Sequence, residues 1–168
     1  ILGLFWAFAQ PIITVLIYWF VFQFAFGSEP VNGMPFILWL ISGILPWFFI
    51  SDAIVSATSS LVDYGYLVKK VVFDINILPL TRIISVLFIQ IVLFIFMMIM
   101  FIGYGYFPNV YWIQLLYYLL YCLFICVGVV YFTSALFVFF KDIVQIVSVI
   151  LQIIFWGTPI VWQISVMS

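Results

Sequence analysis

Polar side chains recur at helical spacing inside three strongly apolar stretches of the sequence. Gln10 and Thr14 lie four residues apart in the first stretch, and Asp52 and Ser56 have the same spacing in the second. The third stretch carries Gln145, Ser148, Gln152 and Trp156. Residues spaced in this way share one face of a helix. Each set is therefore either a close contact between helices or a wetted face, and we take all eight residues as candidates for lining a pathway through the protein.

Asp52 carries the strongest functional signal, because a carboxylate well inside a membrane span costs about 3 kcal/mol on insertion scales. It should be paired, protonated or exposed to water. Arg82 or Lys141 could pair with it only if Asp52 lies deep toward the side where those residues sit. The neighbouring small residues, Ala53 and Ala57, favour a close helix–helix contact on that part of the helix.

Other kinds of chemistry find little support. The chain has no His, so imidazole acid–base and metal chemistry are excluded. The lysines lie in LVKKVV and FFKDIV, which lack the glycines and the following hydroxyl of a phosphate-binding loop. Cys122 and Cys126 are too few for a zinc site and read as packing residues. We expect no catalytic residue, no metal and no cofactor in this chain.

These residues need an all-α, membrane-embedded scaffold. The chain is 70% hydrophobic and 5% charged, whereas soluble domains are about 25% charged. Exposed backbone in lipid must be helical or in a closed barrel, and a span takes about 20 apolar residues. Within a single transmembrane domain, 1–168, we predict five spans, at about 1–26, 36–61, 79–103, 111–139 and 143–162. Because the chain starts inside an apolar run without Met, we expect it to be part of a longer protein.

The basic residues set the predicted orientation. Lys69, Lys70 and Arg82 lie in or just after the loop 62–78, and Lys141 lies between the last two spans. All four therefore fall on one side, which the positive-inside rule assigns to the cytoplasm. Nine charged residues cannot form a nucleic-acid-binding patch, so we expect no nucleic-acid partner.

Three motifs resemble the membrane subunits of ABC type-2 exporters of polysaccharides, O-antigens and teichoic acids. LGLFWAFAQP (2–11) has the Leu-Gly, Trp and Pro spacing of that family's first span. The stretch 42–80 has its Gly-x-x-Pro-Trp, Leu-Val-x-Lys and Ile-Leu-Pro elements, and 139–162 resembles its fifth span. Asp74 and Lys141 depart from the pattern, where Pro and Arg are usual.

The resemblance implies an architecture and a set of partners. Members have six spans and form homodimers, and each subunit docks on one of two ATP-binding subunits that hold ATP and Mg. The loop 62–78 resembles the element that contacts the ATPase; its candidate coupling residues are Tyr66, Leu67, Val68, Lys69, Lys70 and Val71. The first and fifth spans resemble the helices that line the pathway.

The implied function is that of a permease subunit, not an enzyme, in the cytoplasmic membrane of a bacterium. Its implied cargo is a lipid-linked glycan such as an O-antigen, a capsule-like glycan or a teichoic acid. Amides, hydroxyls and aromatic faces suit a sugar polymer. Two alternatives stay open: a drug- or lipid-exporting permease of the same superfamily, and a membrane-embedded enzyme of glycan-polymer synthesis. The second would need convergent acids or a His within the spans.

Overall fold

The computed structural model describes residues 2–25, 30, 33–64, 74 and 76–161. Within these residues the elements are helices, with no strand among them. In chain order they are α1 (Leu2–Phe20), the π-helical η1 (Val21–Ala25), α2 (Phe36–Thr58), α3 (Ser60–Asp63), α5 (Ile77–Gly103), the 3-10 helix η2 (Val110–Trp112), α6 (Ile113–Phe139) and α7 (Ile143–Gly157). The all-α fold class predicted from composition is confirmed.

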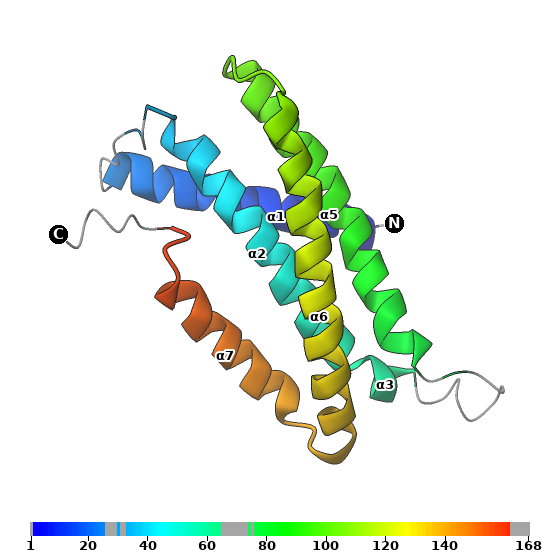
Figure 1. Ribbon diagram of the computed structural model, residues 1–168. Helices are drawn as coiled ribbons and strands as arrows, with labels where there is room; N and C mark the ends of the chain where they lie inside the picture. Colours follow the sequence, from blue (N-terminus) through cyan, green and yellow to red (C-terminus); the bar gives the residue numbers. More distant parts are fainter. Residues whose placement is uncertain (1, 26–29, 31–32, 65–73, 75, 162–168) are drawn as a thin grey trace.

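The bundle is organised around α2, which packs most extensively against α5 and α6. Figure 1 shows α1 crossing behind α2 and α5, while α7 turns back from the end of α6 and diverges from the bundle. The turn between α6 and α7 lies at the same end as α3 and the start of α5 (Figure 1). This arrangement places the segments that contain Arg82 and Lys141 at one end, as the charge distribution predicted.

Local sequence signals account for the ends of α5. Pro79 lies in its first turn, where a missing backbone N–H costs no hydrogen bond. At the other end, Tyr106 N donates to Phe101 O at 3.0 Å and Gly105 N donates to Ile102 O at 2.9 Å. This is a Schellman arrangement, and Gly105 supplies the positive φ of 86° that it requires.

Small residues bring α2 and α6 together. Ala53 and Ala57 are fully buried in a cluster with Cys126 and Val130 of α6. The two helices are also joined by a buried hydrogen bond of 2.8 Å between the hydroxyls of Thr58 and Thr133. Small side chains allow the close approach, and the hydroxyls satisfy each other inside it.

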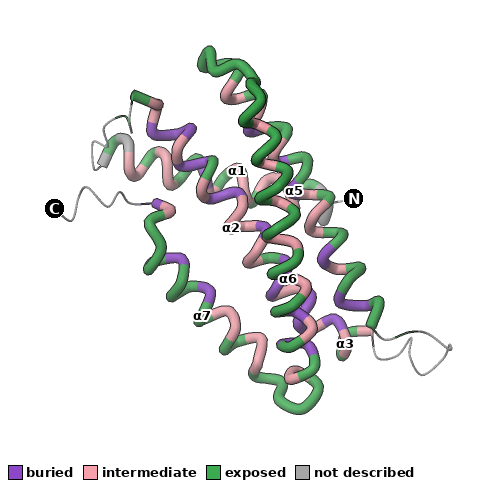
Figure 2. The backbone as a smooth tube through the Cα atoms, viewed as in Figure 1, coloured by how far each residue is buried: buried purple, intermediate pink, exposed green. Residues whose placement is uncertain are grey.

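Three helices are long and apolar enough to cross a membrane: Phe36–Thr58, Ile77–Gly103 and Val110–Phe139. Phe5–Phe20 and Ile143–Gly157 are shorter apolar helices. Figure 2 shows that α5 and α6 expose long outward faces, and exposed apolar side chains such as Phe88 and Phe124 lie on them. These features indicate a multi-pass membrane protein. The five predicted spans correspond to α1, α2, α5, α6 and α7, but α2 ends at Thr58 and α7 at Gly157, and five crossings stay a prediction.

Candidate functional site

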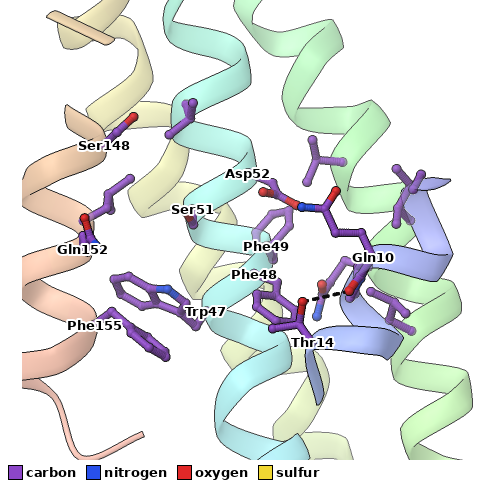
Figure 3. Close-up of a pocket in the computed structure, with 18 of the residues that line it drawn as sticks. Gln10, Thr14, Trp47, Phe48, Phe49, Ser51, Asp52, Ser148, Gln152 and Phe155 are labelled. Atoms are coloured by element: carbon purple, nitrogen blue, oxygen red, sulfur yellow. Dashed lines mark hydrogen bonds between the residues drawn. The ribbon is translucent and has the colours of Figure 1, made fainter. Parts of the chain in front are cut away.

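A cavity of about 620 Å³ lies between α1, α2, α5 and α7. Figure 3 shows side chains of α1 and α7 facing it from either side of α2. Its walls combine polar side chains with aromatic rings. Six of the eight residues that the sequence suggested as pathway-lining are among those that line it: Gln10, Thr14, Asp52, Ser148, Gln152 and Trp156.

The wall formed by α1 and α2 presents an amide, a hydroxyl and a carboxylate. The Gln10 amide and the Asp52 carboxylate point toward one another in Figure 3. Thr14 Oγ1 donates to the main-chain oxygen of Gln10 at 2.9 Å, one turn earlier on the same helix. The hydroxyl proton of Thr14 is thus already used, and its oxygen is left as an acceptor facing the cavity.

The Asp52 carboxylate has no hydrogen bond or ion pair with any residue that the structure describes. Of the two candidate partners, Arg82 instead bonds the hydroxyl of Tyr64 and stacks over its ring, with the guanidinium carbon 4.9 Å from the ring centroid. Lys141 lies in the exposed turn between α6 and α7. The Asp52 side chain is exposed and lines the cavity. Of the environments expected for it, the described residues therefore provide exposure and not an ion pair.

The opposite wall comes from α7. Ser148 Oγ donates to Val144 O at 2.8 Å, which again leaves the hydroxyl oxygen as an acceptor. Gln152 lies one turn further along and is exposed. Because α7 touches α2 but diverges from it, these two side chains face α1 across the cavity (Figure 3).

Aromatic side chains gather in one part of the cavity lining. The rings of Trp47 and Phe155 are 5.6 Å apart between centroids, and those of Phe155 and Trp156 are 5.4 Å apart. Tyr18 of α1 joins the group, 6.2 Å from Phe155. The cluster therefore links α1, α2 and α7 and offers ring faces next to the polar walls.

Gln90 of α5 is a lining residue that the sequence reasoning missed. Its side chain is only 2% exposed, and its Nε2 has no hydrogen-bond partner in the described part of the chain. The available signal was that Gln90 is the only amide in the apolar run 79–103. A lone amide has no periodicity to assign it to a face, so only the packing of α5 shows where it lies.

Two predicted pathway residues lie outside the cavity lining. Ser56 is half-buried and donates to Asp52 O at 2.6 Å, and Gln145 is exposed near the start of α7. The proposed coupling residues, Tyr66, Leu67, Val68, Lys69, Lys70 and Val71, lie outside the described residues.

No family model matches the chain. Curated relatives named "O-antigen export system permease protein RfbA" do match: one from Klebsiella pneumoniae is 28% identical over 96% of this chain, and one from Myxococcus xanthus is 26% identical over 98%. The chain spans 61% and 62% of their lengths, respectively. The resemblance indicated by the sequence motifs is confirmed: this chain is related to O-antigen export permeases.

Proposed function

We propose that this chain is the membrane part of a permease subunit in an ATP-driven ABC exporter, which moves a lipid-linked surface glycan across the cytoplasmic membrane of a bacterium. The observation that carries the proposal is the cavity between α1 and α7, which combines amides, hydroxyls and aromatic rings. Those helices correspond to the two that the resemblance assigns to the pathway. The names of the relatives support the same class of cargo.

The cavity chemistry suits a sugar polymer in transit. Apart from Asp52, its hydrogen-bonding side chains are neutral, and neutral bonds to sugar hydroxyls are weaker than charge-assisted ones, which favours release. Ring faces such as Trp47 and Trp156 offer flat apolar surface to the C–H faces of a sugar ring. Such a surface retains a chain without fixing it in one register, as movement through a pathway requires.

The assembly is proposed to be a homodimer with two ATP-binding subunits, which hold ATP and Mg and supply the hydrolysis. Engineered cysteines at Gln145, Ser148 and Gln152 should cross-link between two copies in the membrane.

The loop 62–78 is proposed to contact the ATPase. Replacing Leu67 and Val68 by Ser should reduce co-purification of the ATPase but leave membrane insertion intact.

The proposal is tested in a bacterium that lacks this gene, with the full-length protein and its ATPase supplied together. Wild type should restore the glycan at the cell surface, and Trp156→Ala combined with Gln152→Ala should reduce surface glycan and leave lipid-linked glycan inside. Phe132→Ala, an exposed change on α6 outside the cavity, is the matched control. Normal surface glycan in the deletion strain would contradict the proposal.

A further inference from the structure

The hydrogen-bonding groups of the cavity are neutral apart from one carboxylate. The Asp52 carboxylate only accepts, and the hydroxyl protons of Thr14 and Ser148 are already donated to main-chain oxygens at 2.9 and 2.8 Å. Gln10 and Gln152 each offer a neutral amide, with one accepting and one donating end. The walls therefore hold both donors and acceptors, as sugar hydroxyls require. Further hydroxyl and indole N–H groups in the lining belong to Trp6, Tyr18, Trp47, Ser51 and Trp156.

The charge of the cavity has one sign. Among the described residues that line it, Asp52 is the only one that is charged, and no Lys or Arg is present to balance it. Of the described cations, Arg82 is held by Tyr64 and Lys141 lies in the turn beyond α6. An anion entering this space would meet a carboxylate without meeting a counter-charge.

Gln90 adds an independent sign that a ligand completes this wall. Its amide is 2% exposed and its Nε2 lacks a partner within the described residues, yet the side chain forms part of the cavity lining. The last side-chain torsion of Gln is soft, so the amide can turn toward the cavity at little cost. A ligand oxygen there would satisfy a donor that the described protein leaves without a partner.

On the basis of the proposed function, we propose that this cavity binds uncharged sugar units through their hydroxyl groups, and that Asp52 discriminates against polymers that carry phosphate or carboxylate groups. A sugar hydroxyl both donates and accepts, so it can donate to Asp52 and accept from Gln90 or Gln10. The phosphodiester and ionised carboxylate groups of charged polymers present acceptors only, and they would face Asp52 with like charge. Within the cargo classes implied by the resemblance, the cavity selects neutral glycans over teichoic acids.

The test compares export of two lipid-linked polymers, one neutral and one bearing phosphate or uronate, by the full-length protein with its ATPase in cells. Wild type should export the neutral polymer preferentially, and Asp52→Asn should lower the neutral-to-anionic ratio by about tenfold, because like-charge repulsion is removed. The ratio is independent of how much protein reaches the membrane. Asp142→Asn is the control: Asp142 is an exposed carboxylate that makes no side-chain capping bond at the start of α7, and its replacement should leave the ratio unchanged.

Equal export of both polymers by wild type, or an unchanged ratio in Asp52→Asn, would overturn the inference while leaving the export function intact. Export of neither polymer by wild type would instead overturn the proposed function and the inference with it. If Asp52→Asn does not fold, the wild-type ratio and Gln90→Met decide. The Gln90 variant should reach the membrane normally but export the neutral polymer about threefold less, since it loses one donor to the sugar.

Discussion

Thr58 and Asp52 lie less than two turns apart on α2, but their surroundings are opposite. Thr58 is fully buried against α6, and its hydroxyl is bonded to Thr133 at 2.8 Å and to Ile54 O at 2.6 Å. Asp52 faces the cavity, and its carboxylate has no partner among the described residues. One side of the helix is thus a closed contact in which polar groups satisfy each other. The other side keeps polar groups available to something outside the chain.

The largest expected effect tests the closed side. Ala57→Leu should lower the free energy of unfolding by up to about 3 kcal/mol, because the side chain has no space between α2 and α6. Denaturant titration of the full-length protein in detergent measures this loss. Ala135→Leu, an exposed change on α6, should remain within about 0.5 kcal/mol of wild type. Equal loss in both variants would mean that the α2–α6 contact is not specifically tight.

On the cavity side, removing a polar group should stabilise the protein instead. Gln90→Met should raise the free energy of unfolding by about 2 kcal/mol, since it replaces a buried amide without a described partner for Nε2 by an apolar chain of similar shape. The same titration measures the gain. The exposed Gln114 provides the control Gln114→Met, for which we expect little change. A loss of stability in Gln90→Met would show that the amide has a structural partner.

The turn between α5 and α6, which lies on neither side of α2, offers a third test. Gly105→Ala should lower the free energy of unfolding by about 1 kcal/mol, because Ala tolerates a φ of 86° poorly. Gly103→Ala, at the end of α5 with open space around it, should be neutral or slightly stabilising. Export should be similar in both variants, since the turn is far from the cavity lining. Reduced export by Gly105→Ala with an unchanged free energy of unfolding would contradict the view that this turn affects stability but not the cavity.

The smallest expected effect concerns the hydroxyl pair itself. A double-mutant cycle of Thr58→Val and Thr133→Val should give a coupling of about 0.6 kcal/mol, the usual size for hydrogen bonds between membrane helices. Each single change removes one hydroxyl and leaves the other with fewer partners. The double change removes both hydroxyls, so neither is left without its partner. Additive effects would indicate that the 2.8 Å contact does not contribute to stability.

The sequence placed the small residues Ala53 and Ala57 beside the polar residues of α2, whereas the structure separates the two sets onto different sides of the helix. Ala53 and Ala57 fall on the closed side, in accord with the close helix–helix contact expected of small residues. Asp52 falls on the open side, in accord with the functional role expected of it. Gln10, Thr14 and Gln152 line one cavity, but spacing grouped only Gln10 with Thr14, and the link to Gln152 came from the resemblance. Spacing within a helix is not enough for a full assignment, since Ser56 and Gln145 have the same spacing and lie outside the cavity lining.

Features that depend on how helices cross were not predictable in this way. Trp47 lies in the Gly-x-x-Pro-Trp motif, but its position beside Phe155 depends on the angle between α7 and α2. Gln90 was missed for the same reason, since its surroundings are set by α1 and α2 and not by its own helix. The end of α7 at Gly157 had a local signal: Pro159 disfavours a helical Thr158, which has φ −99° and ψ 137°.

The early end of α7 has a consequence for the surrounding lipid. Its 15 residues cover only about 22 Å, whereas the hydrocarbon layer of a bilayer is about 30 Å thick. The turn that follows returns to α2, where Val161 is 2% exposed and Ile160 lies 3.4 Å from the position that a Cβ on Gly43 would take. A short apolar helix is accommodated by thinning of the bilayer beside it. We therefore expect a locally thinner membrane next to the cavity, which would shorten the distance that the lipid end of the proposed cargo must cross.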